Sequence, residues 1–79
     1  MTLRDYRESA GLTQEALASL AGLAETSISE FEGERRIPSA ASAGKLCAAL
    51  SLRLGRTVNT WDVWPARFKN PARAEEVHA

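Results

Sequence analysis

The segment from Gly11 to Pro38 constrains the fold of this chain more than any other part of the sequence. Thr13 can cap a helix that begins at the next residue, and the apolar residues after it recur at helical spacing on one face. Gly22 then supplies the left-handed residue that ends this helix and turns the chain sharply. A second short helix follows, with Ile28 and Phe31 as its inward side chains. The sequence therefore predicts two short helices joined by a tight glycine turn.

Two short helices joined in this way form the helix-turn-helix framework, which lays its second helix in the major groove of DNA. The second helix is predicted over residues 25–32, and its outward side chains are polar: Glu25, Thr26, Ser27, Ser29 and Glu30. In such an arrangement these outward side chains are the ones that can contact bases.

Spaced positions along most of the chain fit one known pattern. They are Leu3, Arg7, Gly11 to Glu15, Leu17-Ala18, Gly22-Leu23, Ile28-Ser29, Glu32, Arg36, Pro38 and Leu50. With these residues the chain resembles the lambda-repressor/Cro-type helix-turn-helix family, the XRE-like regulators, from about Leu3 to about Pro65. The resemblance implies an all-α fold, a compact five-helix domain in which helices 2 and 3 form the helix-turn-helix. It also implies a DNA-binding protein that regulates transcription.

The remaining helices and the end of the domain follow from periodicity, glycine and proline. We expect a first helix at about 2–10, a fourth from Pro38-Ser39 to Gly55, and a short fifth helix around Trp61 to Trp64 that Pro65 stops. Residues 1–65 are therefore predicted to form one domain. Residues 66–79 are polar and show no clear periodicity, so they are predicted to form a C-terminal tail that is available to a protein partner.

The charges are distributed unevenly along the chain, although the net charge is zero. Residues 1–34 hold two arginines against seven acidic residues, which gives −5, whereas residues 35–73 hold eight basic residues against one aspartate, which gives +7. Neutralisation of phosphates supplies much of the affinity of a DNA-binding protein. Phosphate contacts are therefore expected from the loop after the second helix of the motif, and from residues beyond it.

Composition and motif content argue against several other classes of protein. No apolar run approaches the roughly 20 residues that span a bilayer, and the N-terminus lacks the organisation of a signal peptide, so we expect a cytoplasmic location. The single cysteine, Cys47, cannot form an internal disulfide and has the spacing of a core residue. His78 has no second ligand nearby, and the chain shows no nucleophile–base pair. We therefore expect no enzymatic activity, no metal and no other cofactor.

The resemblance places the base-reading positions on the outward side of residues 25–32. The principal positions are Glu25, Thr26 and Glu30, with Ser29 on the same side. A glutamate can only accept a hydrogen bond, most naturally from cytosine N4, whereas threonine can offer its hydroxyl or pack its methyl group on thymine. The alternative is that the two glutamates only solvate an exposed helix.

Phosphate contacts are expected on both sides of that helix. Besides backbone amides at the start of the fourth helix, the candidates are Gln14, Ser27, Arg35, Arg36 and Ser39. By resemblance, the position of Gln14 touches the DNA backbone and that of Arg36 approaches the phosphates. Alternatives stay open for both. Gln14 can instead brace the second helix of the motif, or be an exposed glutamine that simply favours helix, and the two arginines can neutralise Glu30 and Glu34.

A structural pair is also implied by the resemblance. Arg7 and Glu32 match two family residues that tie the first helix to the end of the third. The family glycine usually stands two residues after this glutamate, at the place of Glu34, whereas here glycine comes one residue earlier, at Gly33. We therefore expect the loop to bend differently and to displace the two arginines that follow.

The two tryptophans are predicted to have different locations. Trp64 is predicted to cover the core, whereas Trp61, which fits a core or an exposed location, is a candidate for a dimer interface.

The predicted function is regulation of transcription. We expect a small repressor, Cro-like or controller protein that binds a pseudo-palindromic double-stranded DNA operator as a homodimer. The alternative, motivated by the acidic helix face, is a protein–protein interaction module on this scaffold, antitoxin-like or an anti-regulator. Steep salt dependence of DNA binding distinguishes the two.

Overall fold

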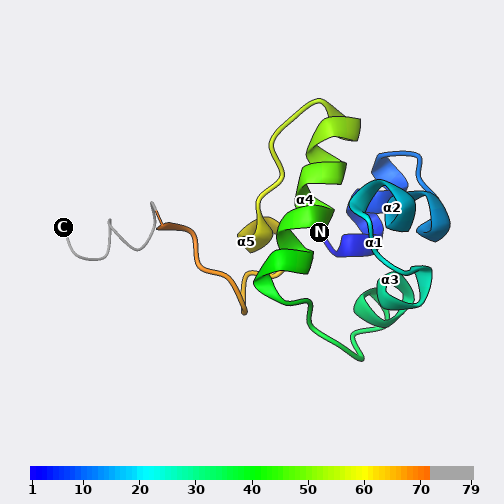
Figure 1. Ribbon diagram of the computed structural model, residues 1–79. Helices are drawn as coiled ribbons and strands as arrows, with labels where there is room; N and C mark the ends of the chain where they lie inside the picture. The colour runs from blue at the N-terminus through cyan, green and yellow to red at the C-terminus, as the bar shows by residue number, and fades with distance from the viewer. Residues whose placement is uncertain (72–79) are drawn as a thin grey trace.

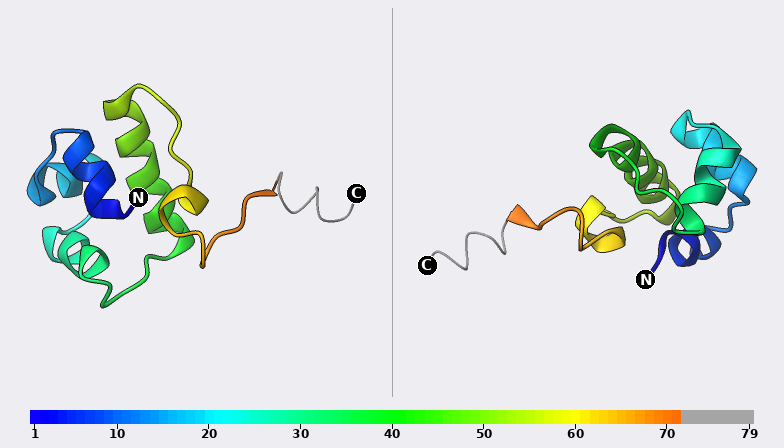
Figure 2. Two further views of the ribbon diagram at one scale, coloured as in Figure 1. Left: turned by 180° about the vertical axis from the view of Figure 1, so that it is seen from behind. Right: turned by 90° about the horizontal axis from the view of Figure 1, so that it is seen from below.

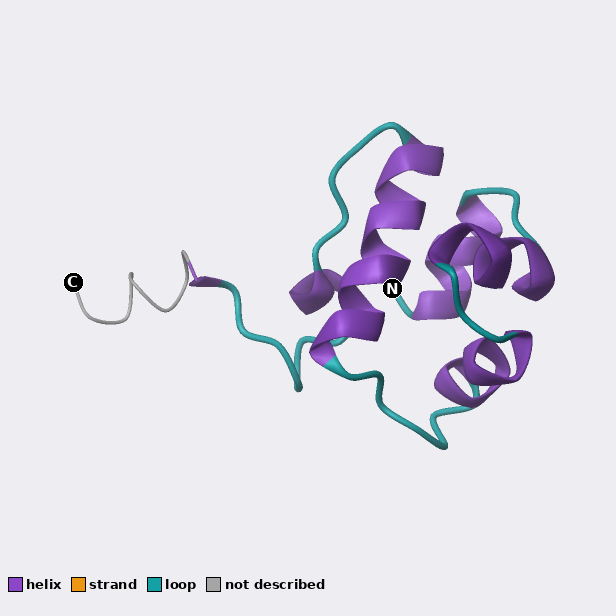
Figure 3. Cartoon of the chain, in the orientation of Figure 1, coloured by secondary structure: helices purple, strands orange, loops and turns teal. Residues whose placement is uncertain are grey.

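The computed structural model describes residues 1–71, and this part of the chain is all-helical (Figures 1 and 3). Its helices are α1 (Leu3–Ser9), α2 (Gln14–Ala21), α3 (Glu25–Glu32), α4 (Ala40–Leu54) and α5 (Thr60–Val63). The predicted all-α, five-helix architecture is confirmed, and the bounds of α2 and α3 are those expected from the sequence. Within this described part, no helix has the length and apolar character needed to cross a membrane.

Hydroxyl caps explain where three of these helices begin. The side-chain oxygen of each cap accepts a hydrogen bond from the backbone N–H three residues later, at 3.2, 3.0 and 3.2 Å, for Thr2, Thr13 and Ser39. No side-chain cap precedes α3, where Ala24 occupies the capping position and Glu25 lies in the first turn. Because a missing hydroxyl cap costs a helix about 1 kcal/mol, α3 depends more than α2 on packing against its neighbours.

The hydrophobic core lies between α4 and the three helices before it. In the views of Figures 1 and 2, α1, α2 and α3 gather on one side of α4, and the chain reaches α5 on the other side. Leu17, Ile28, Leu46 and Leu50 are fully buried and join α2, α3 and α4. Burial of an aliphatic side chain of this size contributes about 2 kcal/mol, so this contact holds α3 to the domain despite its weak start.

The single cysteine belongs to the same core. Cys47 is buried in α4, as its spacing predicts. Burial, and to a lesser degree the charge of Asp62, raises the pKa of its thiol to about 11. The thiol therefore stays protonated at neutral pH and is a poor nucleophile. Among residues 1–71, no group of three or more His, Cys, Asp or Glu side chains is arranged to hold a metal ion.

Both tryptophans lie at the end of the described region. Trp64 follows α5 and packs against the core, as predicted, while Trp61 is half-buried. The ring of Phe68 meets Trp64 edge to face, with 6.2 Å between the ring centroids. Packing thus continues to Phe68, and the division of the chain after Pro65 stays a prediction. Residues 72–79, with His78 and most of the expected tail, lie outside the described residues.

α3 ends in a turn whose left-handed residue is Glu34 rather than Gly33. Gly33 has φ −79°, whereas Glu34 has φ 59°. The N–H group of Glu34 bonds to the carbonyl of Phe31 at 3.2 Å, and that of Arg35 bonds to the carbonyl of Glu30 at 3.0 Å. The expectation that this loop bends differently from that of the family stays a prediction. The chain turns at the place where the resemblance puts a glycine, with a glutamate in the left-handed conformation.

Candidate nucleic-acid interface

α3 presents one polar edge to solvent and one apolar edge to the core. Ile28 and Phe31 form the apolar edge, and both are buried. The five candidates for DNA contact in this helix form the other edge, the first two exposed and the last three half-exposed: Glu25, Thr26, Ser27, Ser29 and Glu30. The structure thus brings the sequence-predicted base-reading positions together on one accessible surface.

The sharp turn between α2 and α3 is built on Gly22. This residue has φ 70°, and the N–H group of Leu23 bonds back to the carbonyl of Ala18 at 2.9 Å. A Cβ added at Gly22 would meet no atom within 4 Å. Glycine is therefore needed here for the backbone conformation and not for space. The predicted order of helix, glycine turn and helix is confirmed.

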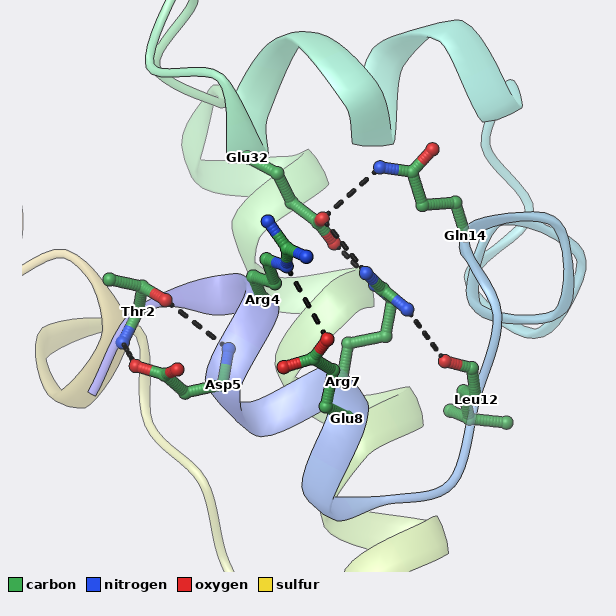
Figure 4. A network of polar contacts seen from close by, with 8 residues as sticks. All are labelled: Thr2, Arg4, Asp5, Arg7, Glu8, Leu12, Gln14 and Glu32. Carbon is green, nitrogen blue, oxygen red and sulfur yellow. Dashed lines mark hydrogen bonds and ion pairs between the residues drawn. The ribbon is translucent and has the colours of Figure 1, made fainter.

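A polar network joins the end of α3 to α1 and α2 (Figure 4). Arg7 of α1 donates from Nε to Glu32 Oε2 at 2.5 Å and from Nη2 to Glu32 Oε1 at 3.1 Å. Its Nη1 donates to the carbonyl oxygen of Leu12 at 2.8 Å, and Gln14 Nε2 donates to Glu32 Oε1 at 3.1 Å. Because partners from α1, from α2 and from the loop between them converge here, the network fixes the last turn of α3 relative to both helices.

The charges in this network are nearly enclosed. The side chains of Arg7 and Glu32 are only 12% and 6% exposed. Burial by itself raises the pKa of Glu32, but the hydrogen bonds from Arg7 and Gln14 together lower it below its ordinary value of 4.5. The pKa of Arg7 is raised, chiefly by its hydrogen bond to Glu32. Both groups are therefore charged at neutral pH, and loss of either one would leave the other buried without compensation.

Gln14 and Ser39, two candidates for phosphate contact, each have a partner in the free protein. The amide of Gln14 braces Glu32, which is one of the roles that the sequence left open for it. The hydroxyl of Ser39 accepts the N–H group of Ser42 as the cap of α4. The second amide hydrogen of Gln14 and the hydroxyl hydrogen of Ser39 take no part in these two bonds. Both side chains can therefore donate to a phosphate without giving up the contact shown here.

The two arginines after α3 differ in their surroundings. Arg36 Nη1 lies 3.0 Å from Glu30 Oε1, and its guanidinium lies 5.1 Å from the ring centroid of Phe31. Arg36 therefore has the acidic partner that the alternative interpretation gave it. Arg35 is exposed and forms no ion pair with another residue of the described region, 1–71. In the free protein, Arg35 is thus the arginine of this loop whose guanidinium is available to bind an external anion.

Comparison with known proteins identifies this arrangement. A family model described as Helix-turn-helix matches residues 3–55, which are 53 of the 79 residues and include α1 to α4. The chain belongs to the Cro/C1-type helix-turn-helix family. Searches among curated proteins and among solved structures found no significant match. Membership supports DNA binding and regulation of transcription as the general function of this protein.

Two arginines further along the chain, Arg53 and Arg56, contact other parts of the domain. Arg53 donates from Nε to the carbonyl oxygen of Ala10 at 3.4 Å, and the guanidinium of Arg56 lies 5.8 Å from the ring centroid of Tyr6. Both of these arginines lie against α1 or its C-terminal cap. Two of the basic residues in the second half of the sequence thus have contacts at α1, whereas Arg35 and the paired Arg36 follow α3 directly.

Sequence reasoning missed three features of this helix-turn-helix site. The carbonyl of Leu12 is a third partner of the Arg7–Glu32 pair, the ring of Phe31 lies against Arg36, and Glu34 takes the left-handed position. The last two occur at or across an irregular turn, where helical spacing no longer relates sequence distance to neighbourhood. The first is a backbone group, whose partners depend on how the loop is folded and not on the residue type.

Proposed function

We propose that this protein is a sequence-specific double-stranded DNA-binding regulator of transcription, with α3 (Glu25–Glu32) in the major groove. The orientation of α3 carries the proposal. Its apolar edge is buried, its polar edge is accessible, and the Arg7–Glu32–Gln14 network ties its end to α1 and α2. A helix supported in this way keeps base-reading side chains in a fixed geometry. We assign this activity to residues 1–65 and propose that residues 66–79 form a tail that binds a protein partner.

In this proposal, four side chains on the exposed edge read bases. Glu25 and Glu30 accept hydrogen bonds from exocyclic amines, most naturally cytosine N4. Thr26 and Ser29 use their hydroxyl groups, and the methyl group of Thr26 can also pack on the methyl group of thymine. Because a carboxylate next to a base without an amine is unfavourable, the two glutamates favour particular sequences more than they favour DNA in general.

Contacts to phosphates supply the sequence-independent part of the binding. Arg35 is the principal candidate, because it is exposed and has no acidic partner among the described residues. Arg36 joins it after leaving Glu30, and Gln14, Ser27 and Ser39 donate from polar side chains around α3. Because each cationic contact to a phosphate releases a counterion, binding should be strongest at low ionic strength.

Binding as a homodimer to a pseudo-palindromic operator is also part of the proposal. Two copies would read half-sites about one helical turn, roughly 34 Å, apart. We place Trp61 in the dimer interface because it is a large aromatic residue that the described chain buries only partly, and such residues often anchor interfaces. Analytical ultracentrifugation at tens of micromolar is expected to show a dimer for the native protein and a folded monomer for Trp61→Ala. A native monomer at that concentration would remove the dimer from the proposal.

Selection from a random-sequence DNA pool with the purified protein tests the function. An enriched palindrome would give the half-site, its spacing and the symmetry of the complex together. Thr26→Ala is expected to change which sequences are enriched. Arg35→Ala is expected to weaken binding to all sequences and to reduce the slope of log affinity against log salt by about 0.9. If no sequence is enriched and duplex binding does not weaken with salt, the alternative, a protein–protein interaction module with an acidic face, is favoured instead.

A further inference from the structure

Glu30 and Arg36 come from two different segments and meet at the exposed edge of α3. Glu30 lies in the last turns of the helix, and Arg36 follows the left-handed residue Glu34. The ion pair spans 3.0 Å between Nη1 and Oε1, and the side chains are 39% exposed for Glu30 and 55% exposed for Arg36. The guanidinium also lies 5.1 Å from the ring centroid of the buried Phe31. These two contacts hold Arg36 beside a base-reading position in the free protein.

We propose that this pair couples base recognition to phosphate contact, an inference that rests on the proposed function. In the free protein, and on a duplex without a suitable base, Glu30 keeps Arg36 as its partner. When cytosine N4 or another exocyclic amine lies opposite Glu30, the carboxylate exchanges the guanidinium for that amine. Arg36 then turns to a phosphate of the same duplex. Glu30 is thus a specificity-determining residue that acts partly through Arg36.

On a matched duplex, both charged side chains have a new partner after the exchange. On a mismatched duplex, Glu30 would have none. On a matched duplex, Arg36 replaces a carboxylate by a phosphate, so it keeps a charge-assisted contact, and Glu30 gains a hydrogen bond from the base. On a duplex without the amine, a released Glu30 would face base edges without a donor, which is unfavourable. An exposed ion pair changes an equilibrium by only about five-fold at most, so a matched duplex can break it.

The neighbouring residues provide the contrast that makes this role specific. Arg35 has no ion pair within residues 1–71, so it is available to a phosphate of any sequence. The loop therefore has one arginine that can bind a phosphate of any sequence. Its second arginine becomes available only after Glu30 has bound a base. Glu34 carries the same charge as Glu30, yet it too has no ion pair in the described region, which makes it a matched control.

A double-mutant cycle on DNA binding tests the coupling. The proteins are the native chain, Glu30→Gln, Arg36→Ala and the double variant, with Glu34→Gln as a control for the loss of one negative charge. Fluorescence anisotropy is measured on a duplex enriched by the native protein and on a scrambled duplex of the same composition, at several salt concentrations. Circular dichroism checks that each variant is folded.

Glu30→Gln is expected to tighten binding to the scrambled duplex by about five-fold and to steepen its salt dependence by about 0.9, because Arg36 is released to a phosphate. In the Arg36→Ala background, the same change is expected to have less than half of that effect. Equal effects of Glu30→Gln with and without Arg36, or an equal effect of Glu34→Gln, would overturn the coupling, since net charge alone would then explain the data. If the native protein binds its enriched duplex and the cycle is additive, the coupling fails and the proposed function stands. If no variant binds any duplex, both fail.

Discussion

The turn after α2 and the turn after α3 have the same hydrogen-bond geometry but different residues at the decisive position. After α2, Gly22 takes the left-handed conformation with φ 70°, and the next N–H group bonds to the carbonyl five residues back at 2.9 Å. After α3, Glu34 takes it with φ 59°, and the corresponding bond is 3.0 Å. Both are Schellman ends, in which glycine is the usual left-handed residue.

The difference shows that a turn can be set by the residue itself or by what holds the chain on either side. Gly22 adopts the left-handed conformation without strain. Glu34 does so at a cost of about 1–2 kcal/mol, so the surrounding structure must impose it. Glu32 is anchored to Arg7 just before this turn, and Pro38 is fully buried just after it. Anchored at both ends, the short loop turns at residue 34 whether or not a glycine is there.

The largest effect is expected from removing the anchor before the second turn. Arg7→Ala leaves the carboxylate of Glu32 buried without its cationic partner, which should destabilise the fold by about 3 kcal/mol. Urea denaturation measures this loss. Arg4→Ala is the matched control on the same helix, because Arg4 pairs with Glu8 at 3.4 Å and both side chains are more than half exposed. A loss for Arg7→Ala no larger than that for Arg4→Ala would show that the network does not hold α3.

A smaller loss is expected at the turn that glycine sets. Gly22→Ala forces a Cβ into the left-handed conformation although there is open space around it. We expect destabilisation by about 1 kcal/mol, after the smaller entropy of the unfolded alanine chain is taken into account. The midpoint of urea denaturation measures it, with Gly44→Ala in the middle of α4 as the opposite control. That control should stabilise the protein, because its added Cβ also meets nothing and its backbone is helical.

A gain is expected at the other turn. Glu34→Gly removes the strain of the left-handed glutamate and should stabilise the protein by about 0.5 kcal/mol, since the greater freedom of glycine in the unfolded chain cancels part of the relief. Thermal denaturation of Glu34→Gly and Glu34→Ala separates strain from charge, because alanine removes the charge and keeps the strain. Should both variants shift the melting temperature equally, the strain assigned to this turn would be wrong.

Mild acid should have the smallest effect on the fold. The pKa of Glu32 lies below 4.5 in the folded protein, so its contribution to stability is complete above about pH 4.5 and is lost as pH falls through the folded pKa. Stability should therefore show no loss from Glu32 between pH 7 and 5 and should fall at lower pH. In Glu32→Gln, this part of the acid-induced loss should be absent, whereas Glu8→Gln, at an exposed position, should keep it. An unchanged acid dependence in Glu32→Gln would contradict the assignment.

The fold could be predicted because its signals are local. Thr13 and Ser39 mark helix starts, Gly22 marks the turn, and the spacing of apolar residues marks the core, so each element is set by residues within or next to it. The position of the Arg7–Glu32 pair came from the family resemblance, because no periodicity relates residues 25 positions apart. The sequence allowed Gln14 to brace α3, but only the folded structure shows that its amide binds Glu32 and that the Leu12 carbonyl binds Arg7.

The candidate site could be predicted only as a set of positions. Sequence placed the polar residues of α3 on one edge, because helical spacing decides that directly. It left open whether Arg36 meets DNA or Glu30, because the two residues are separated by a turn that no spacing rule covers. The left-handed Glu34 was not predictable from its type, since the conformation is imposed by anchors on both sides of the loop.

An NMR titration of the ¹⁵N-labelled protein with its enriched duplex examines the role of α3 without any substitution. The amide signals of Thr26, Ser29 and Glu30, and those of Arg35 and Arg36, are expected to shift most, with saturation at one protomer per half-site. Signals of buried α4 residues such as Leu46 should move little. Shifts that leave residues 25–36 unchanged and concentrate at α5 would contradict the placement of α3 in the major groove.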